Sequence, residues 1–132
     1  MTQTLSDKDD IFHFTADDVG LNTTTGTLST LIDGSDISIG GGVNGLDLVE
    51  STTALGGTTL QAGCILISQS ADDACVGDNC IRTMQQDISY LIVTQAGLDT
   101  VADAELFFDG SDVNLDTTDE DISGLSLSQE EI

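Results

Sequence analysis

The residues with the clearest chemical potential are acidic and gather near the C-terminus. Ca²⁺ takes about six to eight hard oxygen ligands and tolerates irregular geometry, so a dense group of carboxylate and amide oxygens is the kind of set it favours. We therefore predict a calcium site in this stretch, with Ca²⁺ as the only expected cofactor. Its ligand candidates are Asp109, Asp112, Asn114, Asp116, Asp119 and Asp121, and an earlier copy of the same tetrapeptide adds Asp33 and Asp36.

The spacing of these acidic residues shows what kind of calcium site to expect. Asp112, Asn114 and Asp116 have the alternate-residue spacing of a helix-flanked calcium loop, but Thr117 replaces the required glycine and Ser123 stands where that loop needs a glutamate. A site here would therefore lie between β-strands. Two alternatives stay open: solvated Asp-Gly turns without metal, and an acidic surface that keeps the protein soluble in salt.

The charge of the whole chain limits its partners. The 132 residues carry 24 Asp plus Glu against 2 Lys plus Arg, a formal net charge of −22. Such a charge repels itself, and bound cations or a salty medium would relieve the repulsion. The same charge argues against nucleic acids and anionic membrane surfaces as partners. No apolar stretch has the length of a membrane span, and the N-terminus lacks the basic and apolar regions of a signal peptide.

The remaining reactive side chains favour a structural protein over an enzyme. Cys75 and Cys80 flank a four-residue segment and predict a small disulfide in an oxidising compartment. Cys64 lies in an apolar run and is expected in the core. The one histidine, His13, has no nucleophile-elbow sequence to serve. A sugar cleft normally has aromatic platforms, whereas this chain has no Trp and a single tyrosine, Tyr90. We expect no catalytic residues.

The elements that must position these residues occur twice. Five landmarks recur in the same order between about residues 9–49 and 86–127, which indicates one domain over residues 1–132 with two repeats, joined by a central strand and a cysteine-containing loop. The landmarks are an Asp-Ile pair, a Gly-Leu pair, the tetrapeptide Asp-Gly-Ser-Asp (DGSD), an alternating apolar pair after it, and a final Gly-Leu-x-Leu.

Hydrophobic alternation and Gly/Asp turns predict an all-β fold of about seven strands, either a β-sandwich or propeller-blade-like sheets built from the duplicated strand-loop unit. The longest candidate, Leu60–Ser70, is apolar on both faces at Cys64–Ile67 and belongs in the centre of a sheet. The segment Ala71–Gln86 is expected to be a long loop with one helical turn. The other predicted strands are Ile11–Phe14, Thr27–Ile32, Leu46–Leu48, Ile88–Val93, Ala104–Phe108 and Leu125–Leu127.

The second copy resembles a repeat of predicted secreted bacterial proteins, many of them marine, in which a DGSDVxL segment is followed by EDIxxL and by DxDIxxF. Asp109–Leu115 and Glu120–Leu125 match it, and Asp9–Phe14 and Asn22–Ile39 match it more loosely. The resemblance implies a four-stranded, blade-like unit in extracellular proteins whose role is largely unknown.

These observations together predict an extracellular or cell-surface module with a structural or interaction role. We expect calcium to stabilise it and exposed strand edges to let it self-assemble into a homo-oligomer or filament, or to join it to other surface proteins. Two alternatives are kept. One is a glycan-binding or glycan-acting domain, and the other is an acidic inhibitor that mimics DNA.

Overall fold

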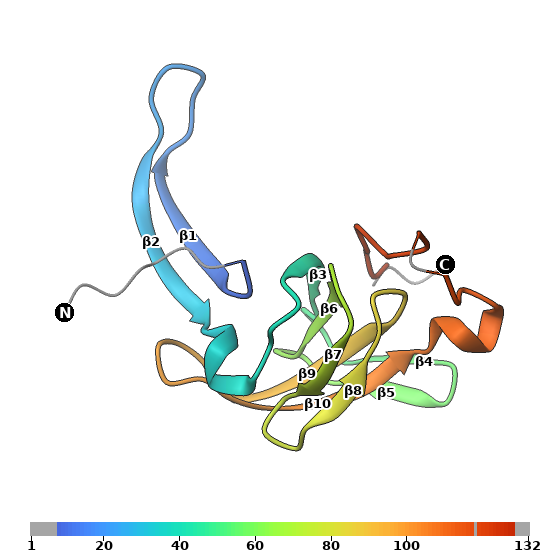
Figure 1. The fold of residues 1–132 in the computed structure, drawn as a ribbon. Helices are drawn as coiled ribbons and strands as arrows, with labels where there is room; N and C mark the ends of the chain where they lie inside the picture. The colour runs from blue at the N-terminus through green and yellow to red at the C-terminus, as the bar shows by residue number, and fades with distance from the viewer. Residues whose placement is uncertain (1–7, 118, 129–132) are drawn as a thin grey trace.

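The computed structural model describes residues 8–117 and 119–128, and their regular structure is β-strand with two short 3-10 turns (Figure 1). The all-β prediction is confirmed. Within these ranges no helix is long and apolar enough to cross a membrane. The strands are β1 (Ile11–Asp18), β2 (Thr25–Ile32), β3 (Val43–Leu48), β4 (Thr53–Leu55), β5 (Thr58–Leu60), β6 (Ile65–Gln69), β7 (Asp73–Val76), β8 (Ile81–Thr83), β9 (Ile88–Gln95) and β10 (Val101–Phe108).

The body of the molecule is a four-stranded antiparallel sheet with the order β10-β9-β6-β3. These strands follow one another along the chain as a meander, with the hairpin β4–β5 inserted before β6 and the hairpin β7–β8 inserted after it. All five residues of β6 are buried, because β6 lies between β9 and β3 and both of its faces are covered. The predicted central position of this segment is therefore correct.

The predicted single strand Leu60–Ser70 is wrong in its extent. Leu60 ends β5, and a turn separates it from β6. In this turn the Cys64 N–H donates to the Gln61 carbonyl at 3.2 Å. Gly63 in this turn has φ +92°, a backbone conformation that a residue with a Cβ rarely adopts. The continuous apolar pattern therefore did not predict the turn between β5 and β6.

The predicted loop Ala71–Gln86 is also wrong, because most of it forms the hairpin β7–β8. Asp73 initiates β7 by accepting the Cys75 N–H at 3.2 Å, and Val76 at its end is fully buried. The strands are only four and three residues long, and their sequences lack a long apolar alternation. Burial of Val76 supplies the stabilisation that the local pattern does not show.

Two apolar clusters cover the two faces of the main sheet. The first lies under the β7–β8 hairpin and the segment after β2, and its buried members are Ile11, Ile32, Ile37, Ile39, Ile65, Ile67, Val76, Leu91, Ala102 and Ala104. The second lies under β4–β5 and the C-terminal segment, and its buried members are Val49, Leu60, Cys64, Leu66 and Tyr90. Alternating residues of β6 and β9 contribute to each cluster, as expected for a strand buried on both faces.

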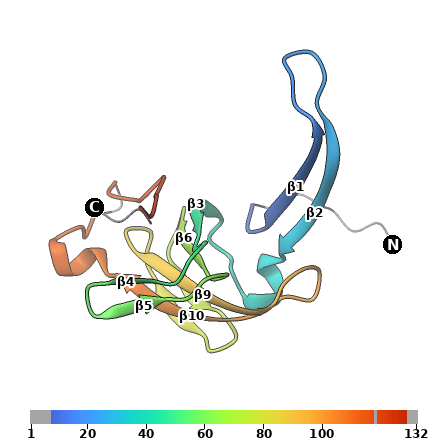
Figure 2. The ribbon, with the colours of Figure 1, turned by 180° about the vertical axis from the view of Figure 1, so that it is seen from behind.

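The hairpin β1–β2 projects from this body, as the two opposite views show (Figures 1 and 2). Its base contributes to the core through Ile11 and Ile32, which pair across the two strands, and through the partly buried Leu31. From His13 to Ser29 every residue is exposed. The hairpin therefore has the form of an arm attached to a compact sheet.

Candidate functional site

The two DGSD segments form equivalent 3-10 turns, η1 (Gly34–Ile37) after β2 and η2 (Gly110–Val113) after β10. In each, the first Asp caps the turn. Asp33 Oδ1 accepts the Ser35 N–H at 3.2 Å and the Ser35 hydroxyl at 2.6 Å, and Asp109 does the same for Ser111 at 3.0 Å and 2.5 Å. Such caps satisfy N–H groups that a short turn would otherwise leave unpaired.

A second Asp fixes each turn to the strand that begins its repeat. Asp10, just before β1, accepts the Gly34 N–H at 2.9 Å, and Asp87, just before β9, accepts the Gly110 N–H at 2.9 Å. The hairpins between them also match, since β1–β2 and β9–β10 each join two eight-residue strands with an irregularity near the base. The unit Asp-hairpin-DGSD thus takes the same form in both copies.

The predicted calcium ligands are distributed over several roles. Asp33 and Asp109 are caps, Asp36 Oδ2 accepts the Thr100 N–H at 2.8 Å, and Asn114 ends η2 in the left-handed conformation at φ 67°. Within residues 8–117 and 119–128, no three acidic, histidine or cysteine side chains form a group that would hold a metal ion. Calcium binding stays a prediction. The exposed candidates are Asp36, Asp112, Asn114, Asp116, Asp119 and Asp121.

Many other carboxylates accept backbone N–H groups, a use that the sequence analysis missed. Asp73 Oδ2, for example, accepts the Gly40 N–H at 2.8 Å, and Asp87 Oδ2 accepts the Met84 N–H at 2.8 Å. With two basic residues in the chain, backbone amides supply most of the available positive partial charge. Further acceptors of this kind are Asp47, Asp72, Asp78 and Glu120.

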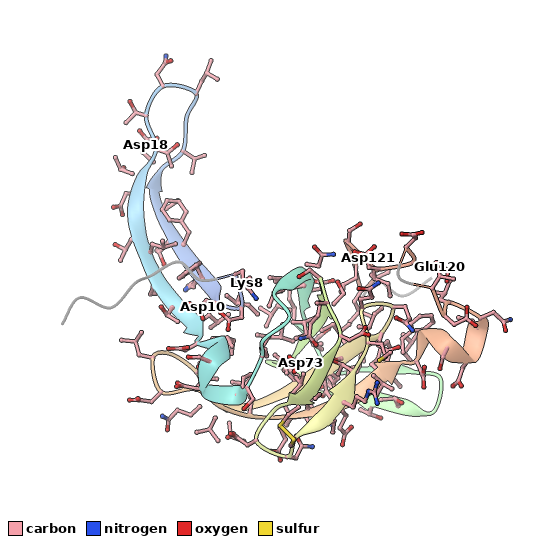
Figure 3. The ribbon with its side chains drawn as sticks, in the orientation of Figure 1. Lys8, Asp10, Asp18, Asp73, Glu120 and Asp121 are labelled. Atoms are coloured by element: carbon pink, nitrogen blue, oxygen red, sulfur yellow. A yellow bond between two sulfur atoms is a disulfide. The ribbon has the colours of Figure 1, made fainter. Side chains whose placement is uncertain are left out.

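The acidic C-terminal stretch turns at Glu120. Its carboxylate accepts the Thr117 N–H at 3.0 Å, and this hydrogen bond lowers the pKa of Glu120 below its usual value. Glu120 and Asp121 lie at the C-terminal end of the body, whereas Asp18 lies far along the arm (Figure 3). The acidic residues therefore cover separate parts of the molecule.

Each outer edge of the main sheet is covered along part of its length. Along β10, the turn between β7 and β8 imitates a neighbouring strand: Asp78 N–H donates to the Ala102 carbonyl, and the Asp78 carboxylate accepts the Ala102 N–H. The side-chain amide of Asn79 donates to the Ala104 carbonyl and accepts the Ala104 N–H, both at 2.8 Å. A covered edge does not recruit a foreign strand. The disulfide between Cys75 and Cys80 closes this turn.

Along β3, the C-terminal segment covers the other edge. The Asn44 amide donates to the Ile122 carbonyl at 3.2 Å, and the Asp47 carboxylate accepts the Leu127 N–H. Leu125 and Leu127 pack against the second apolar cluster. The predicted strand Leu125–Leu127 is wrong in form, because side chains rather than a backbone ladder make these contacts, although the segment lies where a strand would pair.

The arm β1–β2 has no such cover. Its strand β1 corresponds to β9, but β9 is paired with β6 on one side and β10 on the other, whereas β1 pairs with β2 alone among the described strands. Apolar side chains are also exposed on the arm: Phe14 is 45% exposed, Leu28 49% and Leu21 99%. An open edge beside exposed apolar side chains is a recognised place for another chain to dock.

Comparison with protein-family models, curated proteins and solved structures finds no match to this chain. Its candidate site is therefore defined by its own geometry. That site consists of the arm β1–β2, with an open edge and exposed apolar side chains, and the turn η2, which has the same hydrogen-bonded form as η1.

The glycan-binding alternative needs aromatic rings on a shared surface, and Tyr90 and Phe14 lie in different surroundings. Tyr90 is 3% exposed, and its hydroxyl accepts the Gln61 N–H at 2.7 Å, so its ring is inside the second apolar cluster. Burial raises the pKa of Tyr90 above its usual value, and a hydrogen bond with Cys64 raises it further. Phe14, in contrast, lies on the projecting arm. These two rings do not share a surface on which a sugar would stack.

Proposed function

We propose that this chain is a structural or interaction module of the cell surface or extracellular space, which associates through its arm β1–β2 and gains stability from calcium. The observation that carries the proposal is the difference between β1 and β9. The two strands correspond in the repeat, yet β9 is enclosed by β6 and β10, and β1 has one neighbour.

The arm has a composition that suits association. An isolated two-stranded hairpin is marginally stable in water, and this one extends beyond the core, to which its base is joined through Ile11, Ile32 and the partly buried Leu31. Exposed apolar side chains on such an element are stabilised when a partner covers them. Extended backbone with free edge groups can add a strand from a neighbour, which is a common way to join protein modules.

The charge supports a role for cations. A net charge of −22 destabilises the folded chain through self-repulsion, and a cation bound only by the folded form stabilises it by mass action. Asp112, Asp116, Asp119 and Asp121 are exposed and lie within one short stretch. The disulfide in the β7–β8 turn suits an oxidising compartment, which supports an extracellular or surface location.

Thermal unfolding combined with sedimentation velocity tests this function. We expect millimolar calcium chloride to raise the melting temperature well above that in chelator, and above that in sodium chloride of equal ionic strength. We also expect the sedimentation coefficient to rise with protein concentration. Equal stabilisation by both salts would show that screening replaces specific calcium binding. A monomer at every concentration and in both salts would contradict the assembling role.

A further inference from the structure

The turn η1 docks on the tip of the hairpin β9–β10, a contact between the two repeats inside one chain. The Asp33 N–H donates to the Thr100 hydroxyl at 2.9 Å, and the Thr100 N–H donates to the Asp36 carboxylate at 2.8 Å. The Gly97 N–H donates to the Leu31 carbonyl at 2.8 Å. Thr100 is buried by this contact. One side of the contact is therefore a DGSD turn, and the other is a Gly-to-Thr hairpin tip.

Each side of this contact occurs a second time in the chain. The turn η2 is the second DGSD turn, and the tip of β1–β2 is the second hairpin tip, with Gly20 and Thr24 in the places of Gly97 and Thr100. The Thr24 hydroxyl donates to the Gly20 carbonyl at 3.3 Å, as the Thr100 hydroxyl does to the Gly97 carbonyl at 2.6 Å. The two tips differ in length by one residue, since residues 19–24 form the tip of β1–β2 and residues 96–100 form the tip of β9–β10.

Both second copies are exposed. In η1 the apolar residue Ile37 is fully buried, whereas its counterpart Val113 in η2 is 54% exposed. Thr100 is buried, whereas Thr24 is exposed. The turn η2 and the tip of the arm lie at opposite ends of the molecule in both views (Figures 1 and 2), so they do not meet within one chain.

The apolar faces behind the two hairpin tips correspond as well. Ile37 and Ile39 share the first cluster with Leu91 and Ala104, which pair across β9 and β10. The residues in the corresponding places on the arm are Phe14 and Leu28, which pair across β1 and β2 and are each almost half exposed. Val113, the last residue of η2, and Leu115 after it correspond to Ile37, the last residue of η1, and Ile39 after it.

We propose that η2 of one copy docks on the β1–β2 tip of a second copy, in the arrangement that η1 adopts on the β9–β10 tip. The inference rests on the proposed assembling role and names its partner and its surfaces. Asp112 of one copy accepts the Thr24 N–H of the next, and Val113 covers Phe14 and Leu28. Because the two surfaces differ and lie at opposite ends, repetition of the contact makes an open head-to-tail chain or a ring.

Cross-linking of single-cysteine variants tests the pairing. Thr24→Cys and Asp112→Cys are prepared separately, mixed at high protein concentration in high sodium chloride to screen repulsion, and treated with a short bismaleimide. We expect a cross-linked dimer in the mixture and none with either variant alone. The wild-type chain, with Cys64 buried and Cys75 and Cys80 in a disulfide, controls for native thiols. The double variant Asp36→Cys/Thr100→Cys reports the internal contact, and its cross-link leaves the mass monomeric.

A second pair of variants measures the apolar part of the contact. Val113→Lys should weaken self-association at least about tenfold, the effect of losing one buried aliphatic side chain. Leu55→Lys should leave it unchanged, because Leu55 is 48% exposed in β4, outside both surfaces. Assembly that persists without the Thr24–Asp112 cross-link, or dimers of Thr24→Cys alone, would overturn this pairing and leave the proposed function standing. A chain that stays monomeric throughout would overturn self-assembly itself.

Discussion

Gly34 approaches the main chain of Asp9 so closely that a Cβ on Gly34 would overlap the Asp9 carbonyl oxygen. The second copy repeats the contact, since a Cβ on Gly110 would overlap the Gln86 carbonyl oxygen. The glycine of each DGSD turn is thus required by a close approach of two backbone segments. In each copy the contacted residue, Asp9 or Gln86, directly precedes the Asp that accepts the N–H of this glycine.

We expect Gly34→Ala and Gly110→Ala each to lower the free energy of unfolding by about 1–3 kcal/mol, because the added methyl group must displace backbone. Gly57→Ala is the matched control, since a Cβ there meets nothing within 4 Å. Urea denaturation followed by far-UV circular dichroism measures all three, and urea leaves the ionic strength unchanged. A Gly34→Ala midpoint equal to that of Gly57→Ala would refute the close approach.

Removal of the Asp87 carboxylate tests whether these acidic residues stabilise the fold as hydrogen-bond acceptors. Asp87 is buried and accepts the N–H groups of Gly110 and Met84, so Asp87→Ala leaves two donors unpaired and should cost about 2–4 kcal/mol. Asp103→Ala, at an exposed position of β10, removes the same charge and should be neutral or slightly stabilising, because it reduces self-repulsion. Equal effects of the two substitutions on the urea midpoint would show that net charge alone matters.

The elements that depend on short-range contacts can be predicted from the sequence. A DGSD tetrapeptide caps its own turn through neighbouring residues, so its structure follows from short-range chemistry. The apolar run at β6 likewise indicates a strand buried on both faces. The turn at Gly63 is not readable in the same way, because Leu60 and Cys64 on its two sides are apolar and both belong to the second cluster.

The non-local parts depend on contacts that no short motif reveals. Asp36 bonds to Thr100 across 64 residues of sequence, and Asp78 covers the edge of β10 across 24. Sequence alone shows carboxylates of suitable type for calcium, but the same oxygens accept backbone N–H groups once the strands are placed. Identifying which use applies at Asp33 or Asp36 requires the positions of the amides around them.

Titration of the single tyrosine tests the burial of Tyr90. With one Tyr and no Trp in the chain, absorbance near 295 nm reports this phenol alone. Desolvation raises its pKa from 10.0, so we expect ionisation at a higher pH in the folded chain than in urea. The contribution of Tyr90 to the free energy of unfolding is therefore fully present below pH 10.0 and is lost as the pH rises through the pKa of the folded state. Coincident titration curves in the folded and urea-unfolded states would show that the ring is solvated.

The disulfide between Cys75 and Cys80 should stabilise the cover on the β10 edge. Cysteines five residues apart close a small loop, and the chain-entropy estimate for such a loop is roughly 2 kcal/mol. We expect Cys75→Ser/Cys80→Ser to lower the melting temperature and to speed hydrogen exchange at the amides of Ala102 and Ala104, which bond to the turn that the disulfide closes. Reductant should reproduce this loss in the wild-type chain and have no effect on the double variant. Unchanged exchange at both amides in that variant would mean that the turn holds the edge through Asp78 and Asn79 without the covalent link.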